Sequence, residues 1–475
     1  MSVNNIDAIK PRSIAQTISY STGFGLSNLS TSAVITLLLL YYTGVTGISP
    51  WWYALAQTIY AIYNAINDPL VGFLTDKNYP KMLRFGKRFP WIVIGILGMA
   101  LTMQLIYSVP QALYNNDVAI FFWLLISLCL FDTFYSLYFV NHNALGPILF
   151  RTEDNRRKLG SIITLMTTIL LIVGMVLPIV LADSSDPSSF NRFILIAGIL
   201  TILVGGLVLP GVKENKTITK VLTENSDKQQ EEEKHFFKYL VYAIKQKNFM
   251  LVIMALLFFQ VFTNAAIGSM PFFVMNVLGY SNTDPMLQML LTEFAFIFIS
   301  IPIWTKITKK RGFNWVFVTS GLIVAVVSLA LLFTQDLLQS TIVCAFLGFG
   351  MAGFMNLQSP MITNAIDELT VKIGHRKEGV FFGIRTFFER FSLVIGSLIV
   401  AVVRSITHFN PQDTATFTDS ALFGIRIEMI GIGALLLIIA MLLFKKLYDL
   451  DTEKMKVVRE KLSIIDNIPT NRMED

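Results

Sequence analysis

Long apolar stretches recur along most of this 475-residue chain, and they limit the folds open to it more than any other feature. An α-helix needs roughly 20 predominantly apolar residues to cross a bilayer. Such windows predict twelve spans, at residues 18–45, 50–75, 90–112, 118–148, 159–183, 192–212, 249–278, 285–306, 313–334, 340–365, 380–403 and 420–444. Only 15% of the residues are charged, against ~25% in soluble domains. The chain is therefore expected to be an all-α membrane protein.

Basic residues are distributed unevenly between the loops. Sixteen Lys and Arg residues follow even-numbered spans, within 77–88, 151–158, 306–311 and 372–377. Loops after odd-numbered spans hold only Arg192 and Arg404. Because cytoplasmic loops carry the excess of basic residues, both termini are expected in the cytoplasm of a multi-pass plasma-membrane protein. This topology accounts for the net charge of +6, and no basic patch with interleaved aromatics points to nucleic acid.

A polar connector divides the predicted spans six and six. Its KQQEEEK core is typical of a solvated linker. Apolar residues at helical spacing predict an amphipathic helix along the inner leaflet, or else a connector without a binding role, at Phe236, Phe237, Leu240, Val241 and Ile244. The expected organisation is an N-terminal bundle, a connector, a C-terminal bundle and a cytoplasmic tail, at residues 1–212, 213–247, 248–445 and 446–475.

An acid lies inside the second predicted span, in the stretch NAINDPLVGF. A carboxylate at bilayer depth costs ~2.5–3.5 kcal/mol on insertion scales and is normally kept for ion or substrate handling. Asn64 lies one helical turn before Asp68 and shares its face, and Asn67 offers a further oxygen. These three residues predict a site for a small cation or a proton, unless Asp68 only braces the helix beside Pro69.

Polar residues form a stripe along the fourth predicted span. Asp132, Ser136 and Asn143 share a face with Phe139, and Tyr135 lies nearby. A sugar needs paired acceptors for its hydroxyls and apolar contact for its C–H faces, so the stripe is a candidate substrate site. Proton coupling by Asp132 and plain helix packing are the alternatives.

The eleventh predicted span carries four polar residues in two pairs. Arg385 and Glu389 lie one turn apart and can form an ion pair along the helix. Thr386 and Arg390 form the second pair, which leaves the charge of Arg390 without an acid on its own helix face. Asp68 is its candidate partner in the other bundle. Such a contact could couple cation release to gate movement.

The remaining candidates are less specific. Asn28 and Thr31 in the first span could line a neutral cavity, although small polar residues also join helices. Glu293 in the eighth span is a buried acid for which coupling and structural pairing are equally open. Charged residues at the inner ends of spans two, four, ten and eleven are candidate gates or plain topology signals: Asp76, Arg84, Lys87, Arg88, Asp367, Glu368, Arg376 and Glu378.

Several kinds of site are not expected. Cys129 and Cys344 both fall inside predicted spans and lack the spacing of a metal site, which favours buried thiols. No glycine loop of the phosphate-cradling kind and no paired His and Cys spacing occurs in the sequence. An enzyme with a cofactor is therefore not predicted.

The motifs NAINDPLVGFLTDK, RFGKRFPW and DELTVKIGHRKEGVFFGIR, with the polar eleventh span, resemble the glycoside-pentoside-hexuronide:cation symporters, relatives of melibiose permease. That resemblance implies a major facilitator fold of two six-helix bundles around a midplane site. It also implies sodium or proton coupling at the turn Asn64–Asp68, where relatives usually carry acids at both ends, and a basic residue at Arg390 with a threonine at Thr386. Here Asp68 is the sole acid of that turn.

The resemblance implies a monomeric, cation-coupled symporter of a sugar or glycoside. Departures in the first and fifth spans, such as Ser27 and Asn28 in place of charged residues, leave the galactoside constellation incomplete. A lysolipid or other amphiphile is the alternative substrate, and a membrane sensor with the same fold is a third interpretation.

Overall fold

A computed structural model describes residues 12–150, 153–215, 217–219, 222–223, 236–374 and 378–467. Within these ranges the chain is helical, and strand-like pairing is confined to a single bridge between Asp183 and Asp186. The contacts divide the chain into two compact units, Met1–Glu233 and Lys234–Asp475.

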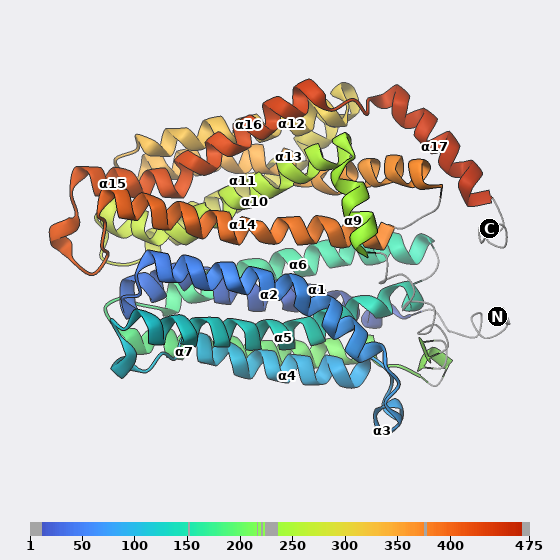
Figure 1. Cartoon of the computed structure of the whole chain (residues 1–475), viewed down its shortest axis with the longest axis horizontal. Coiled ribbons are helices and arrows are strands. Elements are labelled where there is room, and N and C mark those ends of the chain that lie inside the picture. Colours follow the sequence, from blue (N-terminus) through green and yellow to red (C-terminus); the bar gives the residue numbers. More distant parts are fainter. Residues whose placement is uncertain are drawn as a thin grey trace. The chain divides into compact units, whose positions relative to one another are not determined.

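The N-terminal unit is built from six long helices and shorter elements between them (Figure 1). In chain order these are α1 Ile14–Ile35, η2 Leu40–Thr46, α2 Pro50–Asp76, α3 Pro80–Leu83, α4 Phe89–Ile106, η3 Gln111–Leu113, α5 Asp117–Leu149, α6 Glu153–Leu181 and α7 Pro187–Val212. Helix α1 packs on α6 and α7, and α5 packs on both α2 and α4. The contact between α2 and α5 is the one that matters for the site below.

The C-terminal unit begins with a short helix that falls in the predicted connector, α9 Phe236–Ile244. It continues with α10 Lys247–Phe272, η4 Phe273–Val277, α11 Asp284–Arg311, α12 Phe313–Ser328, η5 Leu329–Leu332, α13 Leu337–Ile373, α14 Glu378–Thr407, η6 Thr414–Thr416, α15 Asp419–Arg426, η7 Ile427–Gly431, α16 Ile432–Leu447 and α17 Thr452–Asn467. Helix α13 packs on α11 and α12, and α10 packs on α14 and α16.

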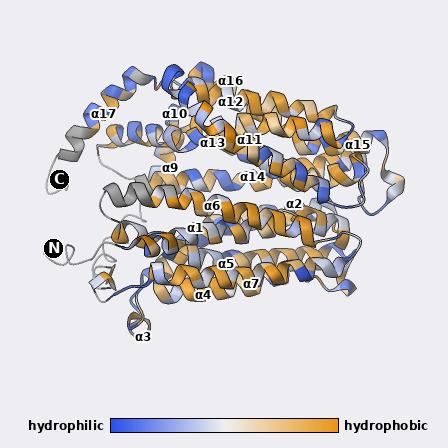
Figure 2. Ribbon diagram, turned by 180° about the vertical axis from the view of Figure 1, so that it is seen from behind, coloured by the Kyte–Doolittle hydropathy of each residue, from blue (hydrophilic) through white to orange (hydrophobic). Residues whose placement is uncertain are grey.

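Eleven helical segments of the described chain are long and apolar enough to cross a membrane. The apolar residues run along most of their length in Figure 2. Helix α2 is long enough, with 27 residues, but it is not one of the eleven. Its run of Tyr, Asn and Asp residues lowers its hydropathy, so the helix that departs from the apolar pattern is the one with the predicted cation site.

Glycines allow the closest helix contacts. A Cβ at Gly95 of α4 would lie 2.5 Å from the backbone nitrogen of Tyr138 in α5. A Cβ at Gly348 of α13 would collide with the carbonyl oxygen of Glu293 in α11. Because lipid gives helices no hydrophobic reason to associate, small residues that permit close packing are a main source of stability between them.

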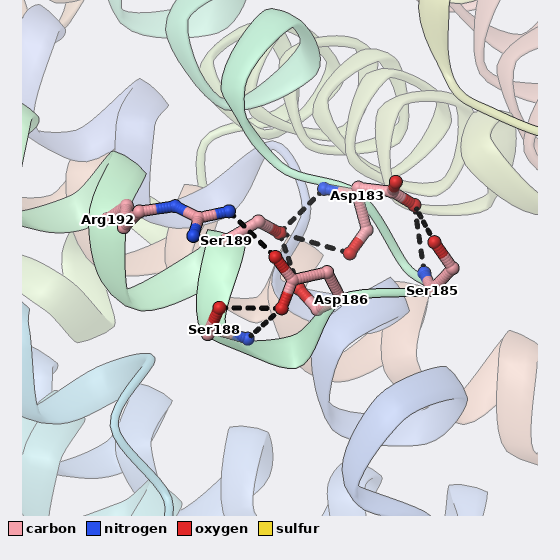
Figure 3. A network of polar contacts seen from close by, with 6 residues as sticks. All are labelled: Asp183, Ser185, Asp186, Ser188, Ser189 and Arg192. Carbon is pink, nitrogen blue, oxygen red and sulfur yellow. Dashed lines mark hydrogen bonds and ion pairs between the residues drawn. The ribbon is translucent and has the colours of Figure 1, made fainter.

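A polar network closes the turn between α6 and α7 (Figure 3). The carboxylate of Asp183 accepts hydrogen bonds from the backbone and hydroxyl of Ser185, and that of Asp186 accepts from the backbone of Ser188 at 3.0 Å. Arg192 forms an ion pair with Asp186 at 2.7 Å. Hydrogen bonds from Ser188 and then from Arg192 lower the pKa of Asp186. Arg192 belongs to α7 rather than to a loop.

The other basic residue expected in an odd-numbered loop is also part of a helix. Arg404 lies in the last turn of α14, with its side chain 1% exposed, and pairs with Glu428 of η7. The helix runs to Thr407, four residues beyond the predicted span, because a charged residue lowers the hydropathy of a window without ending the helix. The charge of Arg404 is balanced inside the unit by an acid that comes 24 residues later.

Candidate functional site

The polar face of α2 turns toward α5 rather than toward the surface of the unit. Asn64 and Asn67 are 9% and 4% exposed, and Asp68 is half-buried. The spacing of three and four residues places all three on one side of the helix. The same spacing on α5 brings Asp132 and Ser136 opposite them.

Both asparagine amides of α2 donate to Asp132. The Nδ2 atom of Asn64 lies 2.8 Å from Asp132 Oδ1, and that of Asn67 lies 2.9 Å from Asp132 Oδ2. Asp132 is 3% exposed. The side chain that was a candidate for sugar recognition therefore lies among the predicted cation ligands.

Ser136 links the two acids. Its hydroxyl donates to Asp68 Oδ1 at 2.5 Å and accepts from Asn67 Nδ2 at 3.0 Å. The same Nδ2 also donates to Asp132, so Ser136 and Asn67 form a short bridge between the carboxylates of Asp68 and Asp132. Asp68 is the sole acid of its own helical turn, but it is not the sole acid of the site.

Hydroxyl groups surround these amides and acids. Tyr60 accepts from Asn64 Nδ2 at 3.1 Å and lies 3.4 Å from Asp132 Oδ1. The hydroxyl groups of Tyr63 and Thr133 lie 2.6 Å apart. We call the eight residues the α2–α5 cluster: Tyr60, Tyr63, Asn64, Asn67, Asp68, Asp132, Thr133 and Ser136.

One acceptor of the α2–α5 cluster is unsatisfied among the described residues. The Oδ1 atom of Asn64 is buried and has no hydrogen-bond partner. A buried acceptor left in this way costs about 1–3 kcal/mol. The cluster thus combines two carboxylates, hydroxyl oxygens and a carbonyl oxygen that needs a partner, which is the donor set of a hard cation.

The other predicted substrate residues of the N-terminal unit lie outside this cluster. Tyr135 is half-buried and stacks on Phe131 and Phe139. Asn143 is half-buried farther along α5. On α1, Asn28 donates to the carbonyl of Thr167 in α6 at 3.4 Å. Thr31 bonds back to its own helix at the carbonyl of Ser27, at 2.8 Å. Of these contacts, only that of Asn28 joins two helices, and the substrate role of these residues stays a prediction.

Helix α14 carries the predicted coupling residues of the C-terminal unit. Arg385 and Glu389 form an ion pair of 2.7 Å along the helix, as their spacing predicts. Thr386 is exposed and donates to the carbonyl of Phe382, and Arg390 is half-buried. Asp68 and Arg390 belong to different units, and a contact between them stays a prediction.

A chain of amides extends the same face of α14. Ser392 accepts from Asn264 at 3.1 Å, and Asn264 in turn accepts from Gln260 at 3.1 Å. Ser392 follows Glu389 by three residues and so shares its face. A continuous polar stripe therefore links α14 to α10.

Glu293 lies where α11 and α13 are in tight contact. Its backbone carbonyl faces Gly348, and Cys344 is near enough for a Coulombic interaction with its carboxylate. Cys344 is a buried free thiol and Cys129 a half-buried one. Glu293 lies in a helix long and apolar enough to cross a membrane, and both pairing and coupling stay predictions for its carboxylate.

A second polar network lies at the end of α2 beyond the α2–α5 cluster. Arg88 forms a buried ion pair with Asp76, and it also donates to Thr75 and Asn141 at 3.1 Å each. Glu214, just after α7, accepts from the backbone nitrogens of residues 87, 88 and 89 and so caps the start of α4. The predicted gate residues Asp76 and Arg88 are thus joined within one unit.

The corresponding end of the C-terminal unit has its own pairs. Glu368 bonds to Lys372 at 2.7 Å and accepts from Asn248 at 3.0 Å. Asp367 is half-buried beside them. Arg376 lies outside the described residues. The gate role of these side chains stays a prediction.

The sequence did not single out Tyr60, Asn141, Glu214 and Glu428 as partners. Tyr60 lies one turn before Asn64 on a face that the sequence already marked as polar, so the signal for it existed. For Asn141, Glu214 and Glu428 the partners lie on other elements, and spacing along the chain carries no sign of them.

Comparison with known proteins connects this geometry to a family. Residues 19–452 match the family described as MFS/sugar transport protein. The sodium-dependent lysophosphatidylcholine symporter 1 of Mus musculus is 23% identical over 490 residues, covering 95% of this chain and 89% of the relative. The inner membrane symporter YicJ of Escherichia coli (strain K12) is 21% identical over 461 residues, covering 95% of each. The raffinose carrier protein of Pediococcus pentosaceus is 23% identical over 400 residues, covering 82% of this chain and 60% of the relative.

Solved structures share the arrangement of helices. The crystal structure of the peptide transporter POT aligns with a TM-score of 0.62 at 13% identity, covering 94% of this chain and 98% of that one. A bacterial homologue of the human lysosomal transporter Spinster, inward-facing and unoccupied, aligns with a TM-score of 0.63 at 12% identity, covering 94% and 97%. At such identities the likeness concerns the fold alone.

Proposed function

Since the chain belongs to the MFS/sugar transport protein family, matched over residues 19–452, we propose that it is a secondary active symporter driven by a cation bound at Asp68. The membership confirms the family resemblance and the all-α major facilitator fold predicted from the sequence. The protein carries its substrate across the membrane unchanged, by alternating access.

The α2–α5 cluster is the observation that carries this proposal. Two carboxylates, from Asp68 and Asp132, lie among amides and hydroxyls between two long helices. Intramembrane acids of this kind are costly and mark ion pathways. Packing alone does not require two carboxylates at this depth, and a cation that enters and leaves gives them a role.

Sodium and the proton are the candidate coupling ions. Relatives named as sodium-dependent symporters favour sodium. The oxygen ligands would be Asp68 with the side chains of Asn64 and Asn67, and the ion is a transported substrate rather than a resident cofactor.

A sugar or glycoside is the proposed co-substrate, in line with the relative named as a raffinose carrier. A lysolipid is the second candidate, because a similarly distant relative is named as a lysophosphatidylcholine symporter. The first span carries Ser27 and Asn28 where the melibiose permease pattern that it resembles has charged residues, which makes a sugar substrate less secure. A sensor that binds without transport is the third candidate.

Uptake into proteoliposomes tests the proposal. The purified full chain is reconstituted and offered a panel of labelled sugars and lysolipids under an imposed sodium gradient, a proton gradient or neither. We expect saturable uptake of one class that rises at least about tenfold with one of the gradients, since a tenfold accumulation needs only ~1.4 kcal/mol of coupling.

Three results would count against it. Saturable uptake that ignores both gradients contradicts coupling. Binding of a panel member without any uptake favours the sensor. Uptake of lysolipids but not of sugars replaces the proposed substrate by the alternative while leaving the symporter in place.

A further inference from the structure

We propose that Asp132 supplies the second negative charge of the cation site, and that with it the α2–α5 cluster selects sodium over the proton. This inference rests on the proposed function, because it concerns the same site. It places one ligand of the site on α5, whereas the motif on α2 contains Asp68 as its only acid.

Asp132 is held in the pattern of an ionised carboxylate. Its Oδ1 accepts from Asn64 at 2.8 Å, and its Oδ2 accepts from Asn67 at 2.9 Å. Both oxygens accept N–H bonds, and an amide nitrogen can only donate. Amide donors stabilise negative charge in a buried place without cancelling it.

The two acids are arranged to share a metal ion rather than a proton. Two carboxyl groups that share a proton lie in direct contact. Here Ser136 Oγ already donates to Asp68 at 2.5 Å, and Asn67 lies between Ser136 and Asp132. The amide of Asn67 and the hydroxyl of Ser136 lie between the two carboxylates, and the hydroxyl is itself an oxygen ligand.

The unpartnered carbonyl of Asn64 points to a ligand. The side chain is 9% exposed, its Nδ2 is used by Asp132 and Tyr60, and its Oδ1 has no hydrogen-bond partner among the described residues. A metal ion bound among these oxygens would give this acceptor a partner. A sodium ion accepts carboxylate, hydroxyl and carbonyl oxygens together, as hard cations do.

Direct sodium binding by the purified full chain tests the inference without knowledge of the co-substrate. Binding of ²²Na⁺ is measured in detergent at constant ionic strength, with choline replacing sodium. The variants are Asp132→Asn, Asp132→Ser and the exchange Asn64→Asp with Asp132→Asn. Because the exchanged atoms lie 2.8 Å apart, the double variant keeps the charge within the cluster. Asp117→Asn, at the first residue of the same helix, is the matched control.

We expect both neutral variants at position 132 to bind sodium at least about tenfold more weakly, a loss typical of removed groups around a metal. The exchange variant is expected to recover affinity to within about threefold of wild type, and the control to match wild type. In Asp132→Asn the new amide group could face the amide groups of Asn64 and Asn67 and prevent folding. Asp132→Ser removes the charge without adding an amide group and so serves as the second neutral variant.

The failures can be told apart. If wild type binds sodium and both neutral variants match it, Asp132 has no part in the site although the symporter stands. If an exchange variant that folds binds no better than the single variant, charge at this place is not what matters. A wild type driven by protons alone overturns the sodium selection, and one that neither binds sodium nor responds to any gradient overturns the proposed function as well.

Discussion

At the scale of the residue, the environment of Asp68 decides what a single carboxylate can do. The acid is half-buried and receives a hydrogen bond from Ser136 at 2.5 Å. A hydrogen bond of that length to an ionised oxygen is among the stronger ones in proteins. Replacing Asp68 by Asn removes the charge but keeps a side-chain oxygen that can accept the hydrogen bond from Ser136.

Replacing Asp68 by Asn is expected to lower gradient-driven accumulation at least about tenfold. Substrate exchange without a gradient is expected to continue. The reason is that coupling needs the charge, whereas the rocking of a loaded carrier does not. Both rates are measured in proteoliposomes with the substrate found in the uptake panel. Arg390→Gln is tested beside it, with the same expectation if Arg390 serves coupling. Full accumulation by Asp68→Asn would show that the cation binds elsewhere.

At the scale of the element, a buried ion pair fastens α14 to the π-helical turn η7. Arg404 bonds to Glu428 at 2.8 Å, and the two side chains are 1% and 0% exposed. Its guanidinium also lies over the rings of Phe272 and Phe409, at 4.2 and 5.3 Å from their centroids. The pair therefore joins three segments, the end of α10, the end of α14 and η7.

Arg404→Met alone is expected to destabilise the protein by about 3–5 kcal/mol, because it leaves Glu428 buried and uncompensated. The double variant with Glu428→Met is expected to cost less, since it removes both charges. Thermal unfolding of the purified protein in detergent measures this, and Arg192→Met at the exposed pair of Figure 3 is the control, expected to unfold like wild type. Equal shifts for Arg404→Met and Arg192→Met would mean that the buried pair adds no stability.

At the scale of the whole molecule, the open question is which ends of the helices face the cytoplasm. The excess of Lys and Arg on one set of loops favours a cytoplasmic position for both termini. On the opposite side Arg192 and Arg404 lie in helix ends, and each pairs with an acid of its own unit.

Sided labelling in intact cells tests this orientation. In a background with Cys129→Ser and Cys344→Ser, we expect a cysteine at Ser185 to react with an impermeant maleimide. A cysteine at Lys310, in the last turn of α11, is expected to react only after permeabilisation. The reverse pattern would place the termini outside.

Much of this molecule could be predicted from local pattern. The apolar windows predicted every long helix, because hydropathy over roughly 20 residues depends only on neighbours in the chain. Their ends were less accurate: α13 ends at Ile373, eight residues beyond its window. The spacing of Arg385 and Glu389 likewise predicted their ion pair. Where the windows failed, at Arg404, a charge inside a helix had a partner that no local window contains.

The sequence by itself determined the number of long helices, the family and the acid on α2, because these follow from composition, spacing and short motifs. Only the tertiary structure decided that Asp132 belongs with Asp68. The hydrogen bond from Ser136 to Asp68 joins residues that lie 68 positions apart in the chain, and it depends on the rotation of α5 against α2. Helical periodicity specifies which residues share a face, whereas the packing of two helices decides which faces meet.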